Sequence, residues 1–283
     1  MTRFGPSGNS QSFYAQGHQA TVQAPPWLQE RGLTAMEYAC GRGVNISLPS
    51  AAAIGEQAAR HGVVMSVHAP YFINLSNDTP EKVQDNRRWI VDSARVADAM
   101  GGSRIVVHPG SGSGQDRPDL LRRAIAQMKL MVSALADEGL AHVRICPETM
   151  GKRNQLGHEA EIYALCEADE TLIPCFDFAH IHALHRGGLN SCEDFARTID
   201  EAERVLGRER LLEMHVHFSH VEYTKGGERR HVNFCDEGFG PDFAHLARVI
   251  KPRRYHPVFI SESRGNMAED AMEMMRIWHE TPE

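Results

Sequence analysis

The feature that most constrains this chain is a regular alternation of short apolar runs with longer helical patterns. Runs rich in β-branched residues predict strands near Arg3–Gly5, Ala35–Ala39, Val63–His68, Arg104–His108, Val143–Glu148, Ile173–Asp177, Leu212–His217 and Pro257–Glu262. Apolar residues spaced three or four apart predict helices near Pro26–Arg31, Ala51–His61, Glu81–Met100, Pro118–Glu138, Glu159–Glu167, Cys192–Leu206, Phe239–Ile250 and Met267–His279. Because parallel strands need crossover connections, this alternation predicts a parallel α/β fold.

The number of repeats favours a closed barrel over an open sheet. The chain has 283 residues, close to the roughly 250 typical of an eight-stranded α/β barrel. No G-x-G-x-x-G motif follows the first predicted strand, which argues against a dinucleotide-binding sheet. No Pro/Ser-rich linker or low-complexity tract divides the sequence. We therefore predict the α/β class and a single (β/α)₈ TIM barrel domain over residues 1–283.

Composition excludes several other classes of protein. No apolar run approaches the roughly 20 residues that span a bilayer, and the first residues lack the apolar core of a secretory signal. We therefore expect a soluble, cytoplasmic protein with no membrane partner. The six cysteines contain no CxxC pair, so they predict neither a zinc knuckle nor a disulfide framework. A net charge of −7 argues against a broadly basic nucleic-acid surface.

From the third strand onward, each predicted strand ends in a side chain that can bind a metal ion. These residues are His68, His108, Glu148, Asp177, His217 and Glu262. In a parallel barrel the carboxyl ends of all strands lie on one face, so these side chains converge. Imidazole and carboxylate together suit zinc, manganese or iron, and the absence of cysteine argues against a purely structural zinc site. The pattern predicts an open, catalytic metal site.

Two further histidines lie beside these ligands. His215 points to the same side of its strand as His217, and we prefer His217 as the ligand because it lies closer to the strand end. His180 follows Asp177 by three residues, which brings an imidazole in the next turn near the strand-end carboxylate. Taken alone, Asp177 is equally typical of a helix N-cap.

A charged segment, Lys225–His231, follows the seventh predicted strand. It carries Glu228 and His231 as candidate ligands, with Lys225 and Arg230 as candidate substrate contacts. The alternative is a solvated charged loop with no role in the site. We predict a long loop that lies over the proposed metal site.

The sequence resembles the endonuclease IV family of abasic-site endonucleases, within the xylose-isomerase-like barrels. The similarity spans Val63 to Glu262 and is strongest in HAPYFINLSNDTPEK, VVHPG, PETMGKRNQLG, FDFAHIHA, MHVHFS and SES. The resemblance implies two or three Zn²⁺ ions, with Mn²⁺ or Fe²⁺ as alternatives at one site. One ion would be held by His68, His108 and Glu148, a second by Glu148, Asp177, His217 and Glu262, and a third by His180, Glu228 and His231.

The resemblance also implies a reaction and a partner. The expected activity is hydrolysis of damaged double-stranded DNA on the 5′ side of an abasic site, by an ionised water with no protein nucleophile. Glu148 would be the catalytic residue and Tyr71 would stack at the lesion. Arg42 would contact the DNA from the loop after the second strand, which lacks the longer insertion of the family. The third-metal motif also differs, because Glu-x-x-His replaces Asp-x-His.

Two alternatives remain open on the sequence. The first is a sugar-phosphate isomerase or epimerase of the same barrel group, which uses one divalent ion and for which Arg264 would bind the phosphate. The second is a noncatalytic binding barrel that keeps metal ions for stability. The additional His180, Glu228 and His231, together with Tyr71, favour the endonuclease over the isomerase. The binding barrel is disfavoured because no ligand-type position is missing.

Overall fold

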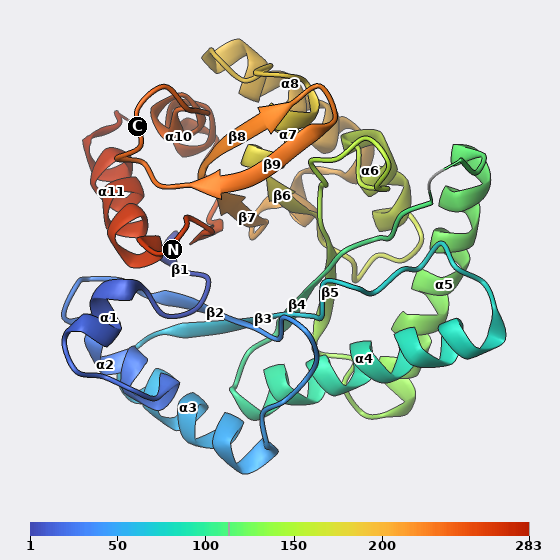
Figure 1. Ribbon diagram of the computed structural model, residues 1–283, viewed down its shortest axis with the longest axis horizontal. Helices are drawn as coiled ribbons and strands as arrows, with labels where there is room; N and C mark the ends of the chain where they lie inside the picture. The colour runs from blue at the N-terminus through green and yellow to red at the C-terminus, as the bar shows by residue number, and fades with distance from the viewer. Residues whose placement is uncertain (113, 283) are drawn as a thin grey trace.

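A computed structural model describes residues 1–112 and 114–282, and its strands form a closed parallel barrel (Figure 1). The barrel strands are β1 (Arg3–Pro6), β2 (Ala35–Ala39), β3 (Val64–His68), β4 (Arg104–Val107), β5 (Arg144–Pro147), β6 (Cys175–Asp177), β7 (His215–Phe218) and β10 (Val258–Ser261). They form two four-stranded halves, β1-β10-β7-β6 and β2-β3-β4-β5. Parallel bridges from Ser7 to Glu37 and from Glu148 to Cys175 join the halves. The predicted TIM barrel is confirmed.

Helices surround the strands on the outside (Figure 1). The predicted ones correspond to α2 (Ala24–Gln29), α3 (Leu48–Arg60), α4 (Pro80–Ala99), α5 (Arg117–Asp137), α6 (Glu159–Cys166), α8 (Cys192–Leu206), α10 (Phe243–Ile250) and α11 (Met267–Glu280). Shorter segments not predicted from the sequence are α1 (Gln11–Ala15), η1 (Thr21–Gln23), α7 (Phe178–Leu184), α9 (Arg208–Leu211) and η2 (Lys251–Arg253). Among the described residues, no helix is long and apolar enough to cross a bilayer.

One helix boundary differs from the prediction for a local reason. The sequence pattern starts the helix predicted near Phe239–Ile250 at Phe239, whereas α10 begins at Phe243. Asp242 caps the helix, because its side chain accepts a hydrogen bond of 2.8 Å from the Ala244 amide. Pro241 disfavours helical backbone at the residue before it, which keeps the preceding segment extended.

The segment predicted as a long loop after β7 is a β-hairpin instead. It consists of β8 (His220–Thr224) and β9 (Gly227–Val232), which pair antiparallel. Bridges from Lys152 to Gly227 and from Val221 to Gly240 attach the hairpin to its neighbours. A Cβ at Gly227 would lie 2.1 Å from the Gly151 carbonyl oxygen, so only glycine permits this approach. The prediction that this segment is a loop was wrong.

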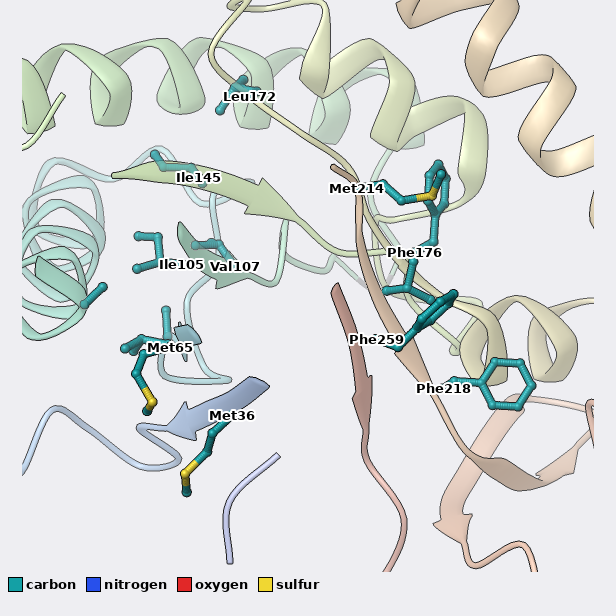
Figure 2. Close-up of a cluster of buried hydrophobic side chains, with 14 of the residues drawn as sticks. Met36, Met65, Ile105, Val107, Ile145, Leu172, Phe176, Met214, Phe218 and Phe259 are labelled. Atoms are coloured by element: carbon teal, nitrogen blue, oxygen red, sulfur yellow. The ribbon is translucent and has the colours of Figure 1, made fainter. Parts of the chain in front are cut away.

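The main hydrophobic core lies between the barrel and its helices. Figure 2 shows side chains such as Ile105, Ile145, Phe176 and Phe259 that project from the strands into this layer. The Phe259 ring lies 5.2 Å from Phe4, 5.1 Å from Phe243 and 5.5 Å from Trp278, measured between centroids. These rings connect β1 and β10 with α10 and α11. The aromatic cluster therefore stabilises the pairing of the first and last barrel strands, which closes the barrel.

We predict that Phe259→Ala lowers the free energy of unfolding by about 3–5 kcal/mol, because it leaves a cavity in a fully buried aromatic cluster. Urea unfolding of the metal-free protein measures this change. Leu130→Ala is the control, since Leu130 lies on α5 and is 55% exposed, and its cost should stay below about 0.5 kcal/mol. Equal costs for the two variants would contradict the predicted role of Phe259.

Candidate metal centre

Potential metal ligands from six barrel strands meet at one mouth. Each lies within one residue of the end of its strand, at His68, His108, Glu148, Asp177, His217 and Glu262. Overlapping groups of donors have ligand atoms within 4.8 Å of one another, among them His68–His108–Glu148, Glu148–Asp177–His217–Glu262 and Asp177–His180–His231. His68–His217–Glu262 and Cys175–His215–His217 also converge. A cavity of about 390 Å³ opens onto this mouth and is lined by His68, His108, His180, His231 and Glu262, among others. The strand ends therefore converge as the barrel topology requires.

His68 and His108 both direct one ring nitrogen at Glu148. The Nε2 atoms of His68 and His108 lie 3.2 and 3.0 Å from Glu148 Oε2. The opposite nitrogens face backbone carbonyls, with Nδ1 of His68 2.8 Å from Ala69 O and Nδ1 of His108 3.2 Å from Tyr71 O. When each Nδ1–H donates to its carbonyl, the neutral ring keeps a lone pair on Nε2. This backbone support is typical of metal-binding histidines.

Glu148 connects the donor groups. Its side chain is fully buried, and its second oxygen, Oε1, lies 3.1 Å from His217 Nδ1 and 3.5 Å from His180 Nδ1. Burial raises the pKa of this carboxyl, but the imidazoles of His108, His217 and His68 outweigh burial and hold the pKa well below its usual value. Glu148 is therefore anionic and reaches two groups of ligands at once.

One oxygen of Asp177 accepts no hydrogen bond from the described residues. Its Oδ1 caps α7 by accepting a 2.8 Å hydrogen bond from the His180 amide. Its Oδ2 is buried and has no hydrogen bond to the rest of the described chain. Burial raises the pKa of Asp177, although His180 and His231 oppose this shift. A buried oxygen with no donor is the arrangement that a cation would satisfy, so the residues at this mouth fit a metal ion.

His180 lies behind this oxygen on α7. Its Nδ1 lies 2.9 Å from the Thr149 carbonyl oxygen and 3.3 Å from Asp177 Oδ2. Gly151 makes room for this packing, because a Cβ there would lie 2.9 Å from His180 Cδ2 and 2.6 Å from Glu228 Cβ. The glycine therefore allows α7 and β9 to approach each other across the mouth.

The hairpin brings His231 to the site, whereas Glu228 has a different partner. The rings of His180 and His231 are 5.0 Å apart between centroids, and His231 Nδ1 lies 2.7 Å from Ser219 Oγ. Glu228 lines the cavity but forms an ion pair of 3.3 Å with Lys152. In residues 1–112 and 114–282, no group of converging donors includes Glu228.

Of the residues expected to contact substrate, Tyr71 lines the cavity and is half-exposed. Arg42 is exposed and follows Gly41, which lines the cavity. Lys225 is exposed at the turn of the hairpin. Arg230 is held by Glu222 at 2.6 Å on the exposed hairpin, and it is not among the residues that line the cavity.

Sequence reasoning missed two residues at this mouth. Lys152 lines the cavity, and nothing in its local sequence distinguishes it from a surface lysine. Glu37 is fully buried inside the barrel on β2. The sequence did contain a sign of this residue, because Glu37 is a lone glutamate within the apolar run Ala35–Ala39. An unpaired carboxylate buried in such a run is costly, so a partner for it could have been expected.

Electrostatics around Glu37 and Glu262 follow from nearby imidazoles. Burial raises the pKa of Glu37, but the imidazoles of His217 and His215 outweigh burial and hold this pKa well below its usual value. Burial likewise opposes ionisation of Glu262, and His217 lowers its pKa to about 2. Burial lowers the pKa of His215 to about 4, so this imidazole is neutral. The site therefore contains ionised carboxylates around its imidazoles.

Comparison with known proteins is consistent with this geometry. An uncharacterized protein of Methanocaldococcus jannaschii is 32% identical over 89% of this chain and 90% of its own length. A probable endonuclease 4 of a Geobacillus species is 30% identical over 73% of this chain and 70% of its own length.

Two solved structures share the fold. Endonuclease IV from Thermus thermophilus has a TM-score of 0.68 at 22% identity and covers 98% of each chain. A D-tagatose 3-epimerase-like protein has a TM-score of 0.75 at 18% identity and covers 99% of this chain and 97% of that one. At these identities the likeness concerns the fold alone.

The family model described as xylose isomerase-like TIM barrel matches residues 25–278. This match and the probable endonuclease 4 relatives confirm the expected resemblance. The chain belongs to the xylose isomerase-like TIM barrel family.

Proposed function

We propose that this protein is a metal-dependent phosphodiester hydrolase that cleaves damaged double-stranded DNA on the 5′ side of abasic sites. The observation that carries the proposal is that several overlapping donor groups meet in one mouth. A single tetrahedral ion needs only four ligands, so these donors exceed the needs of one ion. The probable endonuclease 4 relatives support a DNA substrate.

The proposed ligand sets follow the converging groups. His68, His108 and Glu148 would hold one ion, and Glu148, Asp177, His217 and Glu262 a second. His180 and His231 would hold a third together with Asp177 or Glu228. Zinc suits this mixture of imidazoles and carboxylates, with Mn²⁺ or Fe²⁺ as alternatives at one site. Bound ions would supply an ionised water at neutral pH and stabilise charge on the phosphoryl oxygens.

The protein itself would position the DNA. Glu148 would orient the attacking water, because its buried carboxylate reaches two donor groups. Tyr71, half-exposed at the cavity, would stack where the abasic site leaves a gap. Lys152 and Lys225 would contact phosphates near the mouth, with Arg42 on the opposite loop. Arg230 would contribute only after leaving Glu222.

A second candidate is a sugar-phosphate isomerase or epimerase. The observation in its favour is that Glu148, Asp177, His217 and Glu262 alone make a complete four-ligand set for one divalent ion. Carboxylates in such a site would move protons beside a polarised carbonyl. The two candidates differ in the number of ions bound and in the need for His231.

We expect purified protein to bind two or three transition-metal ions per chain and to cut a duplex that contains one abasic site. Metal analysis and gel-based cleavage should be run together, with an undamaged duplex of the same sequence as the control. Removal of the metal with a chelator should abolish cleavage, and added Zn²⁺ or Mn²⁺ should restore it. Binding of one ion with no cleavage after restoration would contradict the nuclease and favour the isomerase.

Glu148→Gln should reduce cleavage more than about 100-fold, because loss of even a residue that supports a ligand costs about 10–100-fold. The amide keeps the shape of the side chain but removes the negative charge between the two donor groups. Initial rates on the abasic duplex measure the effect, and circular dichroism checks that the barrel folds. Wild-type rates in the variant would remove Glu148 from the mechanism.

His231→Ala should bind about one ion per chain fewer than the wild type, because a site with three protein ligands loses one of them. Elemental analysis after dialysis against buffered Zn²⁺ measures the difference. His142→Ala is the matched control, since His142 is exposed and pairs with Asp98 through an ion pair of 2.7 Å. An unchanged metal content in His231→Ala would show that the third set is assigned wrongly.

A further inference from the structure

Glu37 lies inside the barrel beside the proposed ligand His217 and has three polar side chains around it. Ser66 Oγ donates a 2.9 Å hydrogen bond to Glu37 Oε2, and His215 Nε2 lies 2.9 Å from the same oxygen. His217 Nε2 lies 2.9 Å from the other oxygen, Oε1. Glu37, His215 and His217 are fully buried, and Ser66 nearly so. The contacts come from β2, β3 and β7, which are far apart in the sequence.

The backbone holds Glu37 as firmly as its side-chain partners do. Glu37 is the register partner of Ser66 between β2 and β3, so the two side chains leave the sheet as neighbours on one face. Glu37 also bridges to Ser7 at the β1–β2 seam, and its carbonyl oxygen accepts a 2.9 Å hydrogen bond from the Gly8 amide. The backbone of Glu37 is therefore fixed to β1 and β3, and Ser66 and His215 hold one oxygen of its carboxylate.

Hydrogen-bond chemistry then assigns the His217 ring. An ionised carboxylate only accepts hydrogen bonds, so a ring nitrogen that faces it carries the proton. His217 Nδ1 also faces carboxylates, at 3.1 Å from Glu148 and 3.5 Å from Glu262, so without an ion it carries a proton too. An ion bound among Nδ1, Glu148 and Glu262 would take the place of that proton and leave the one on Nε2. Within the described residues, neither His217 Nε2 nor Glu37 Oε1 has a hydrogen-bond partner, so their 2.9 Å approach is an ion-pair contact and no other group competes for either atom.

We propose that Glu37 is a positioning residue that holds His217 in the Nε2–H form, so that Nδ1 binds the ion shared with Glu148, Asp177 and Glu262. Ser66 and His215 complete the arrangement by occupying the other Glu37 oxygen. His215 thus supports Glu37 and is not itself a ligand. The proposal rests on the metal site proposed above, and on no assumption about the substrate. Carboxylates behind ligand imidazoles fix the ring and raise its basicity.

The test is metal affinity of the Glu37→Gln variant, measured with Zn²⁺ or Co²⁺ alone. The amide offers one acceptor oxygen and an NH₂ donor, so it cannot accept from both imidazoles at once. We expect one class of site to bind about 10–100-fold more weakly by chelator competition. The visible spectrum of bound Co²⁺ should change with it, while the site at His68 and His108 remains occupied. Unchanged affinity and spectrum would overturn the proposal.

Two matched variants distinguish a loss of metal affinity caused by a misplaced His217 from one caused by a less stable protein. Glu222→Gln removes a carboxylate that pairs with Arg229 and Arg230 on the hairpin, and it should bind metal as the wild type does. Ser66→Ala removes one donor to Glu37 and keeps both imidazole contacts, so its loss of affinity should be smaller than that of Glu37→Gln. An equal loss in all three variants would show a nonspecific effect on folding and overturn the proposal.

A measurement on the wild type decides the matter even if Glu37→Gln does not fold. Nitrogen NMR of ¹⁵N-histidine-labelled, zinc-loaded protein should show His217 protonated at Nε2 and coordinated through Nδ1. Coordination through Nε2 would overturn the proposal. Wild-type protein that binds ions but leaves abasic DNA uncut would contradict the nuclease activity, while the NMR assignment would still decide the role of Glu37.

Discussion

Ionised carboxylates inside the barrel mouth are the constraint on which the rest of this structure depends. Glu37 and Glu148 are fully buried, and a buried carboxylate is costly unless donors or cations face it. The donors come from strands distant in the sequence, so only a closed barrel supplies them together. Aromatic packing of Phe259 outside the sheet and the narrow approach at Gly5, where a Cβ would lie 1.8 Å from the Ala35 carbonyl oxygen, hold that closure.

The barrel and much of its mouth could be predicted because both follow from short-range rules. A strand buried on both faces is an apolar run, so the eight strands were visible without tertiary information. The convergence of His68, Glu148 and Glu262 required only one further rule, that the carboxyl ends of parallel strands share a face. Asp177 shows that two interpretations can hold together, since one oxygen caps α7 and the other faces the site.

What could not be predicted depends on which segments pair with one another. The mixed charges of Lys225–His231 match a solvated loop as well as a strand, and only the antiparallel pairing of β9 with β8 distinguishes them. Arg230 was expected to contact substrate, yet its pairing with Glu222 on the facing strand is a matter of hairpin register. The surroundings of Glu37 were hidden because its partners lie on β3 and β7.

The hairpin of β8 and β9 gives the mouth a layered construction (Figure 1). Most of the converging donors belong to the barrel strands or the residues directly after them, whereas His231 belongs to an appended connection between β7 and α10. Such a connection can lengthen, shorten or be exchanged during evolution without altering the register of the sheet. Barrels that share the same ligands on their strands can therefore come to bind different numbers of metal ions. A change in this one connection would be enough to alter the reaction that the barrel catalyses.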